Sequence, residues 1–463
     1  MKNLFYLSVF TVAIITLVGF SSHSAYAINY VIADQSTCQA APFNGSWNPA
    51  FGCTVHGFTL NGATSNLEIK VTTLNTGNIT DGGTITIDKG VNFENTGLVN
   101  NGGSIINSGT IIINATGNLG NLRGHTITNN LGGTISNSGL LGNNGILVNS
   151  GAITINTTGT LSNWKGATIT NNLGGTISNS GLLGNNSTLS NSGTITINST
   201  GTINNWTVGS ITNNLGGNIS NSGLVANHGV LANSGTMTID TTGTISNWKG
   251  HTITNNIGST ISNSGLIGNN GTLANSGTIT ITTTGTMRNW PTGSSTNNGI
   301  ISNSGAIVNN SNLSNSGTIS GTGSFHSALS RIKNTGTITD PVIVPNTVIA
   351  TNYSLSYPVV VPSGATLTVN SGRTLTIPSG QTLTIKLGAT VSNSGTINNN
   401  GTIINSGIVN NNNIINNNAT GTMTNKGTVN NNATGTINNL GVIHASTGTL
   451  NNTGTLTGNP WVP

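Results

Sequence analysis

Charged residues are scarce in this chain of 463 residues, which has only 12 Lys or Arg and 7 Asp or Glu. They make up 4% of the positions, against roughly 25% in a typical soluble domain. Hydrolytic sites are built on paired carboxylates or on an acid beside a histidine. Calcium-bound repeats need rows of Asp, and nucleic-acid surfaces need dense Lys and Arg. The composition therefore argues against most hydrolytic enzymes, a calcium-bound repeat and a nucleic-acid partner.

Cysteine is nearly absent as well, since Cys38 and Cys53 are the only two. An even pair lying close together in the chain of an exported protein is typical of a disulfide. A metal site would need further ligands near the pair, where His56 stands alone, and a redox site usually has a tighter CxxC spacing. We therefore predict a structural disulfide, no metal site and no cofactor.

Long apolar runs are missing except at the N-terminus, where residues 4–20 are almost unbroken in apolar character. Lys2 precedes this run, and the small-x-small pattern Ala25-Tyr26-Ala27 follows it, as in a cleaved signal peptide. The alternative is a single membrane anchor, for which the run is at the short limit. We expect residues 1–27 to be removed on export. The mature chain should then be secreted or lie at the cell surface without a stable transmembrane segment.

Asn, Thr and Gly dominate the composition, with 79, 76 and 65 copies. Their arrangement is periodic, because four full copies of a 42-residue repeat span residues 119–286 and a fifth, degenerate copy starts at Met287. Each copy contains shorter units of six to eight residues that end in Gly, such as TISNSG, LIGNNG and TLANSG. This periodicity is strong evidence for a repeat architecture.

The units have the local pattern of short strands joined by tight corners. Thr-Ile-Thr and Thr-Leu-Thr alternate with period two, and Asn and Gly supply the backbone conformations of corners. One unit buries almost nothing, so the units must stack. We predict an all-β parallel β-solenoid, expected to be a right-handed β-helix, with about 21 residues per coil and two coils per repeat. Ile and Leu would stack inside, and Asn would form hydrogen-bonded ladders at the corners. A disordered tract is the alternative, which the regular apolar placement disfavours.

The order of units along the chain also predicts a domain organisation. The length of the two repeat arrays predicts a rod of roughly 80–100 Å. Prolines interrupt the repeat once, and an eight-residue unit then restarts it in ATLTVNSG, RTLTIPSG and QTLTIKLG. The predicted parts are an N-terminal cap with the disulfide (28–75), a solenoid with 42-residue repeats (76–340), a Pro-containing linker or insertion (341–362) and a second solenoid segment (363–463).

Short units such as GTISNSG and GTINNNG resemble the Asn/Gly/Thr-rich β-helix repeats of secreted surface proteins of bacteria and archaea. These include filamentous-haemagglutinin-like and autotransporter-passenger adhesins. The resemblance covers most of the chain and implies an adhesive solenoid. No C-terminal outer-membrane barrel and no further secretion domain is recognisable in the sequence.

A row of tryptophans is the sharpest candidate site. Each replaces a small polar corner residue and should point outward, with rings ~9.6 Å apart because each repeat has two coils. Flat rings at regular intervals can stack on the faces of sugars, so extracellular polysaccharide is a candidate ligand. The alternative is that the rings only pack against the corner. The candidate ligand-binding residues are Trp164, Trp206, Trp248 and Trp290, with Lys165 and Lys249 beside two of them.

Three weaker patterns have structural explanations beside the functional ones. His125 and His251 share a repeat position, but Ala167 and Gly209 interrupt the row, so no metal row results. Asp81, Asp88 and Glu94 are the only local group of acids, which a capping coil explains better than a catalytic site. Pairs of threonines would form a flat hydroxyl array like that of ice-binding solenoids, or simply a solvated strand surface. These pairs are Thr126/Thr128, Thr168/Thr170, Thr252/Thr254, Thr366/Thr368, Thr374/Thr376 and Thr382/Thr384.

The sequence thus predicts an exported, non-catalytic rod with a structural and adhesive role at the cell surface or outside the cell. The first alternative is a polysaccharide-binding or ice-binding solenoid that uses the Trp or Thr rows. The second is a β-helix polysaccharide lyase or hydrolase. Expected partners are extracellular polysaccharide, neighbouring cell-surface components or further copies of the chain.

Overall fold

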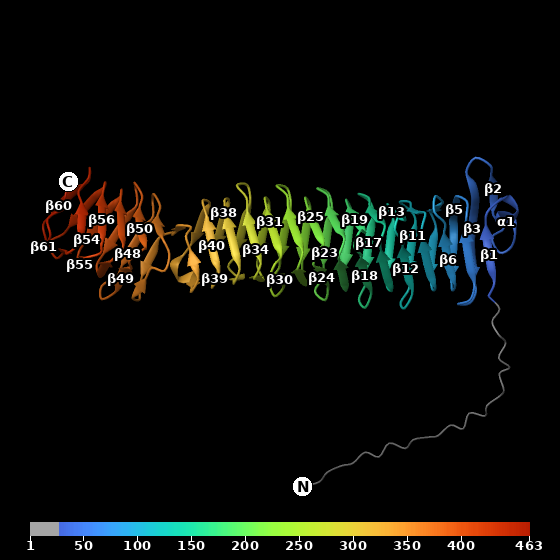
Figure 1. The fold of residues 1–463 in the computed structure, drawn as a ribbon, viewed down its shortest axis with the longest axis horizontal. Coiled ribbons are helices and arrows are strands. Elements are labelled where there is room, and N and C mark those ends of the chain that lie inside the picture. The colour runs from blue at the N-terminus through green and yellow to red at the C-terminus, as the bar shows by residue number, and fades with distance from the viewer. Residues whose placement is uncertain (1–26) are drawn as a thin grey trace, which may run out of the picture.

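The computed structural model describes residues 27–463, which form one elongated rod (Figure 1). This part of the chain contains 61 strands, one short α-helix and one 3₁₀ turn. Most strands have four residues and pair in parallel with the strand three places further along the chain. For example, β12 (Thr126–Asn129) pairs with β15 (Ile146–Asn149), and β15 pairs with β18 (Thr168–Asn171). About 20 coils of three strands each therefore stack along the rod, which confirms the predicted parallel β-solenoid.

The 42-residue repeat corresponds to two coils of slightly different length. Asn129 pairs with Asn149 at a sequence separation of 20, and Asn149 pairs with Asn171 at a separation of 22. The lengths alternate because two-residue corners and four-residue corners alternate along each edge of the rod. The predicted two coils per repeat are confirmed.

Each coil contributes one strand to each of three faces. Face 1 contains β14 (Leu140–Asn143) and β17 (Thr160–Asn163), face 2 contains β12 and β15, and face 3 contains β13 (Thr134–Asn137) and β16 (Ala152–Ile155). Because the chain visits the faces in the same order in every coil, a given corner position forms a column along the rod.

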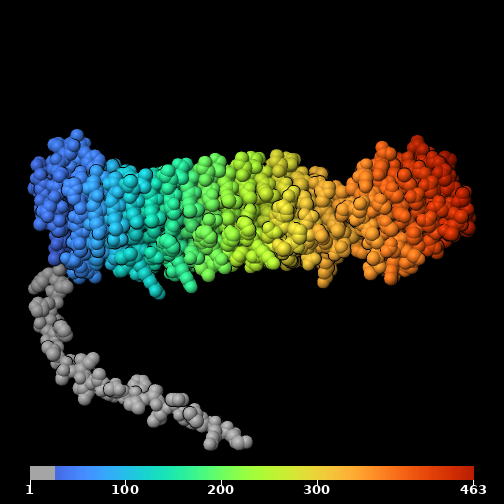
Figure 2. Space-filling model, turned by 180° about the vertical axis from the view of Figure 1, so that it is seen from behind, coloured from blue at the N-terminus to red at the C-terminus, as the bar shows by residue number. Residues whose placement is uncertain are grey.

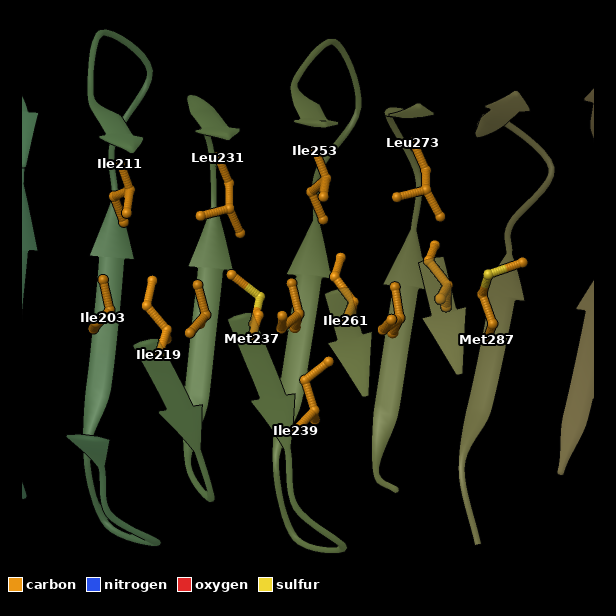
Figure 3. Packing of buried hydrophobic residues seen from close by; sticks show 14 of the residues in the cluster. Ile203, Ile211, Ile219, Leu231, Met237, Ile239, Ile253, Ile261, Leu273 and Met287 are labelled. Atoms are coloured by element: carbon orange, nitrogen blue, oxygen red, sulfur yellow. The ribbon is translucent and has the colours of Figure 1, made fainter. Parts of the chain in front are cut away.

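The core is a narrow stack of aliphatic side chains inside the three faces. The second residue of almost every strand points inward, so Ile203, Ile211 and Ile219 of one coil meet at the centre (Figure 3). The next coils add residues such as Leu231 and Met237 on top of them. One continuous buried cluster extends in this way from the first coils to the last, and its burial supplies the main driving force for stacking.

The fourth strand residue also points inward, and on faces 1 and 2 it is usually a buried Asn. Its Nδ2 donates to the Oδ1 of the Asn in the next coil, as from Asn185 to Asn205 (2.8 Å) and from Asn205 to Asn227 (2.7 Å). An amide both donates and accepts, so the chain of bonds can continue without leaving a buried group unpaired. The predicted Asn ladders are confirmed. The face 1 ladder consists of Asn101, Asn121, Asn143, Asn163, Asn185, Asn205, Asn227, Asn247, Asn269, Asn289 and Asn309.

The N-terminal end of the rod is covered by α1 (Gln35–Gln39) and by the hairpin of β2 (Ser46–Asn48) and β3 (Gly52–Leu60). The predicted disulfide is confirmed, because Cys38 of α1 is bonded to Cys53 of β3. Around it, Phe43 makes an edge contact with Phe58 at a centroid distance of 4.9 Å.

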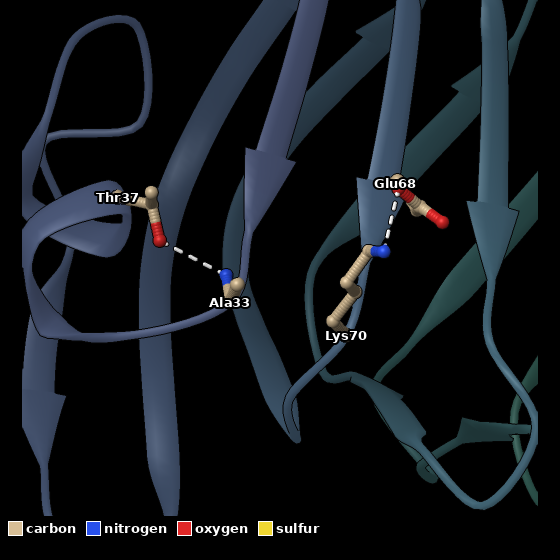
Figure 4. A network of polar contacts seen from close by, with 4 residues as sticks. All are labelled: Ala33, Thr37, Glu68 and Lys70. Atoms are coloured by element: carbon tan, nitrogen blue, oxygen red, sulfur yellow. Dashed lines mark hydrogen bonds and ion pairs between the residues drawn. The ribbon is translucent and has the colours of Figure 1, made fainter.

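Polar contacts are also present at this end (Figure 4). The hydroxyl of Thr37 accepts a hydrogen bond from the Ala33 amide (2.9 Å), and Lys70 forms an ion pair with Glu68 (3.1 Å). Strand β1 (Asn29–Ile32) pairs in parallel with β4 (Asn66–Ile69), so the stacking of coils already begins within the predicted cap.

Residues 341–362 form a junction at which the rod narrows (Figure 2). Face 1 runs through it, since β41 (Ser324–Ser327) pairs with β44 (Val342–Ile343), β44 with β47 (Val359–Val361), and β47 with β50 (Thr382–Ile385). The other two faces end before the junction and restart within it as two six-stranded sheets, which begin with β45 (Thr347–Ile349) and β46 (Tyr353–Ser354). The segment is thus a transitional coil through which one sheet continues.

The predicted signal peptide lies almost wholly outside the described residues. Within residues 27–463, no helix has the length and apolar character needed to cross a membrane.

Candidate functional site

The corner that leads from face 1 to face 2 carries the tryptophans. Trp164, Trp206 and Trp248 each follow the last Asn of a face 1 strand, and their side chains are 49%, 48% and 50% exposed. Trp290 occupies the same position one repeat later and is partly buried. The guanidinium of Arg288 lies 4.8 Å from the centroid of the Trp290 ring, as in a cation–π contact.

Three of the four indoles lean back over a glycine of the preceding coil. A Cβ added to Gly184 would lie 3.6 Å from Nε1 of Trp206, and one added to Gly268 would lie 3.4 Å from Nε1 of Trp290. Gly142 has the same relation to Trp164, at 3.7 Å. The Gly in LLGN and LIGN therefore makes room for the ring. Packing thus accounts for one part of each indole, while about half of the surface of the first three stays exposed.

A histidine that sequence reasoning missed completes part of this column. His228 occupies the same corner one coil after Trp206 and one coil before Trp248. Its ring stacks on both, with centroid distances of 6.3 Å to Trp206 and 4.8 Å to Trp248 and interplanar angles of 24° and 18°. His251 contacts it edge-on at 6.0 Å. Burial, and then the charge of His251, lower the pKa of His228, which favours its neutral form. The sequence signal that could have placed His228 in this column is the alternation of 22-residue and 20-residue coils, as between Asn205, Asn227 and Asn247.

Between Trp164 and Trp206 the same column is open. Asn186 takes the position that His228 has one repeat later, and a cavity of about 440 Å³ lies between the two tryptophans. We call it the Trp164–Trp206 groove. It is lined by Ser162, Asn163, Trp164, Leu182, Gly184, Asn186, Trp206, Thr207 and Val208.

The two candidate lysines lie in the same corners as the tryptophans. Lys165 and Lys249 are exposed and follow Trp164 and Trp248 directly, but neither lines the groove. Thr207 and Pro291 occupy the equivalent positions of the other corners, so the positive charges do not form a continuous row. A binding role for the Trp and Lys side chains stays a prediction.

The threonine pairs do not form one hydroxyl surface. The pairs at Thr366, Thr374 and Thr382 lie on β48 (Thr366–Val369), β49 (Thr374–Ile377) and β50, which belong to three different sheets. In the 42-residue repeats, the coil between Thr126 and Thr168 presents Ile146 at the same position, and the coil before Thr252 presents Val230. The geometry therefore gives little support to an ice-binding face.

The three acids of the first coils do not form a site either. Asp88 is in the turn after β6 (Thr84–Ile87), and Glu94 is on the outer side of β7 (Asn92–Asn95). Asp81, by contrast, is buried and pairs in register with Asn101, so it stands where the face 1 ladder begins. The described residues contain no group of three or more His, Cys, Asp or Glu able to hold a metal ion.

Asp81 is a poor ladder member because an ionised carboxylate has no proton to donate to Asn101. Burial raises its pKa to about 6, against the opposing effects of a hydrogen bond from the Gly83 amide (2.8 Å) and of the charge on His125. Its Oδ2 has no hydrogen-bond partner among the described residues. The protonated acid would supply the missing donor.

We therefore expect Asp81→Asn to stabilise the protein at neutral pH. The folded-state pKa of about 6 is above the ordinary value of 3.8, so the stabilising proton is held below pH 4 and lost as the pH rises to about 6. The variant should gain roughly 2 kcal/mol in the free energy of unfolding at pH 7.5 and almost nothing at pH 4. Urea denaturation at both pH values measures this, with Asp88→Asn as the control. An equal gain at both pH values would contradict the assignment.

A second exposed row lies at the corner between faces 2 and 3. The four-residue turns after β12, β18, β24 (Ser210–Asn213) and β30 (Thr252–Asn255) protrude along one side of the rod (Figure 1). Each tip carries a large aliphatic residue that is 83–87% exposed. The recurring Asn-Asn-Leu-Gly-Gly pattern, which becomes Asn-Asn-Ile-Gly-Ser in the last turn, was the sequence signal for this row. We call it the aliphatic row; it consists of Leu131, Leu173, Leu215 and Ile257.

Comparison with known proteins adds little to this description. The chain matches no known protein family and no curated protein sequence. Among solved structures it shows a remote similarity to the crystal structure of a TibC-catalyzed hyper-glycosylated TibA fragment. The identity is 16% and the TM-score 0.16, over 83% of this chain and 98% of that one. The architecture therefore rests on the strand pairings themselves.

Proposed function

We propose that the protein is an exported, non-catalytic rod that acts at the cell surface or outside the cell as a structural and adhesive element. The observation that carries this proposal is the repetition of the same outward side chains along a rigid rod. Trp corners and aliphatic tips recur every two coils, or ~9.6 Å. Weak contacts repeated at fixed spacing add up to firm attachment when they engage together.

The inner construction supports the same role. The Asn ladders and the aliphatic stack hold the coils together from inside, so the outer positions are free to vary without loss of the fold. A core of hydrogen-bonded Asn side chains and stacked aliphatic residues suits a chain that has to keep its shape outside the cell. The Cys38–Cys53 bond is also stable there. The partners we propose are extracellular polysaccharide and neighbouring cell-surface components.

The proposal is tested with the full chain produced in its source cell. Protease treatment of intact cells should remove the protein, and beads coated with purified protein should adhere to cell-wall preparations. Replacement of all four residues of the aliphatic row, Leu131, Leu173, Leu215 and Ile257, by Ser should reduce bead adhesion severalfold. The circular dichroism spectrum should show that the fold is unchanged. Protection of the protein inside intact cells, or beads that adhere no better than albumin-coated beads, would contradict the proposal.

A further inference from the structure

We infer that the Trp164–Trp206 groove is a slot for one pyranose ring of a neutral polysaccharide whose ring hydroxyls are all equatorial, such as a β-1,4-linked glucan. The inference names a ligand class for the adhesive function proposed above and rests on that function for its biological role. Two successive gaps in the same aromatic column differ, since one is filled by a protein side chain and the other is open.

The tryptophan rings are spaced so that one further ring fits between them. Trp164 and Trp206 are two coils apart, so their rings are separated by ~9.6 Å along the rod. A ring held midway would lie ~4.8 Å from each, within the 4.5–7 Å range of stacked aromatic contacts. The next gap, between Trp206 and Trp248, shows this arrangement filled by the protein itself, with the His228 ring 4.8 Å from Trp248 and 6.3 Å from Trp206.

The residue at the centre of each gap determines whether the gap is open. Asn186 and His228 have the same place in the same two-residue corner, one repeat apart. The histidine ring fills its gap, whereas the short amide of Asn186 leaves the groove of about 440 Å³ open. The two flanking rings are half exposed, so a ring can enter from the side of the rod.

The lining of the groove combines apolar surface with uncharged polar groups. Leu182 and Val208 add apolar surface beside the rings, while Ser162, Asn186 and Thr207 bring hydroxyl and amide groups. None of the lining residues is charged. Such a site fits a neutral ligand with apolar faces and hydrogen-bonding edges, because polar groups at the edge fix orientation while flat surfaces supply contact area.

A sugar ring with only equatorial hydroxyls has this form, since both of its faces expose C–H groups. An axial hydroxyl would point into one of the two indoles and would lose its hydrogen bond to water. The ring stack lies along the rod, so a ring between the tryptophans faces along the rod axis. The polysaccharide would therefore cross the rod at this slot and would not run along the tryptophan row.

The test uses the purified full chain and two soluble probes, cellohexaose and the corresponding β-1,4-mannohexaose, whose rings carry an axial hydroxyl. Binding is followed by calorimetry and by saturation-transfer NMR. We expect cellohexaose to bind at one site per chain and mannohexaose to bind at least tenfold more weakly. Asn186→His should weaken cellohexaose binding at least tenfold, since it fills the slot as His228 fills the next one. Asn204→Ala, outside the groove, should bind as the parent does.

A gain-of-binding variant keeps the test independent of lost folding. His228→Asn should open the second gap and raise the stoichiometry towards two. Unchanged cellohexaose binding in Asn186→His, or equal binding of both hexaoses, would overturn the slot. It would also be overturned if tryptophanamide occupied the groove at a lower concentration than cellohexaose does, because the natural ligand would then be an aromatic side chain of a protein. Beads that adhere to cell walls although the chain binds no cellohexaose would sink the slot and leave the rod function standing. Cellohexaose binding by a chain found only inside cells would support the slot and contradict the proposed surface function.

Discussion

Replacing Asn205 by Ala is expected to lower the free energy of unfolding of the surrounding coils by about 4 kcal/mol. The Asn205 Nδ2 donates to the Oδ1 of Asn227 (2.7 Å) and to the carbonyl of Val230 (2.9 Å). Its Oδ1 accepts from Asn185 (2.8 Å). The substitution removes all three bonds from a fully buried position, and an unpaired buried polar group costs about 1–3 kcal/mol.

Native-state hydrogen exchange at the amides of β23 (Thr202–Asn205) and β26 (Leu224–Asn227) measures this loss locally. The matched control is Asn204→Ala, because Asn204 is the same residue type one position earlier on the outer side of the same strand. The control should change the opening free energy by less than about 0.5 kcal/mol. Similar losses in the two variants would show that the ladder is not what holds the coils together.

Gly229→Ala is expected to destabilise the same coils by about 3 kcal/mol, although Gly229 has an ordinary backbone conformation. Coils stacked ~4.8 Å apart leave no room above the inner corners. A Cβ at Gly229 would overlap the carbonyl oxygen of Gly209 and lie 2.6 Å from that of Trp206. The added methyl group has to push two coils apart and weaken the strand pairs on both sides.

Gly216→Ala makes a sharp comparison, since its φ of +81° is the conformation that normally demands glycine. Nothing lies within 4 Å of a Cβ at this protruding turn, so only the backbone cost of about 1–2 kcal/mol applies. Urea denaturation of both variants compares the cost of steric overlap between coils at Gly229 with the cost of backbone conformation at Gly216. A larger loss in Gly216→Ala would mean that backbone conformation, not coil spacing, controls the glycine positions.

The repeat made most of the fold predictable. Alternation in Thr-Ile-Thr identified the inward residue of each strand, and the spacing of the tryptophans gave two coils per repeat. The junction was harder, because the prolines indicated a break while the pairing of β44 and β47 carries face 1 through it. That pairing joins residues with no repeat signature, so no local pattern could reveal it.

The candidate site was only partly predictable from the sequence. The Trp row was visible because Trp is rare here, but its neighbours came from the other coil of the repeat. His228 and Asn186 are adjacent to the tryptophans only through parallel pairing between coils of alternating length. Glycine in this sequence generally indicates a corner, whereas Gly184 lies within a strand and makes room for an indole. The threonine pairs were harder to place, since those spaced by 42 residues lie on face 2 in alternate coils, whereas those spaced by eight residues lie on three different faces.

Small-angle X-ray scattering of the purified chain tests the central claim most directly, because every proposal above depends on coils stacked into a rod. About 20 coils predict a maximum dimension of ~100 Å and a radius of gyration of about 30 Å, with the cross-section of a thin rod. A radius of gyration of about 22 Å would indicate a compact globule, and one of about 80 Å would indicate an unfolded chain. Either of these last two results would contradict the solenoid and the sites built on it.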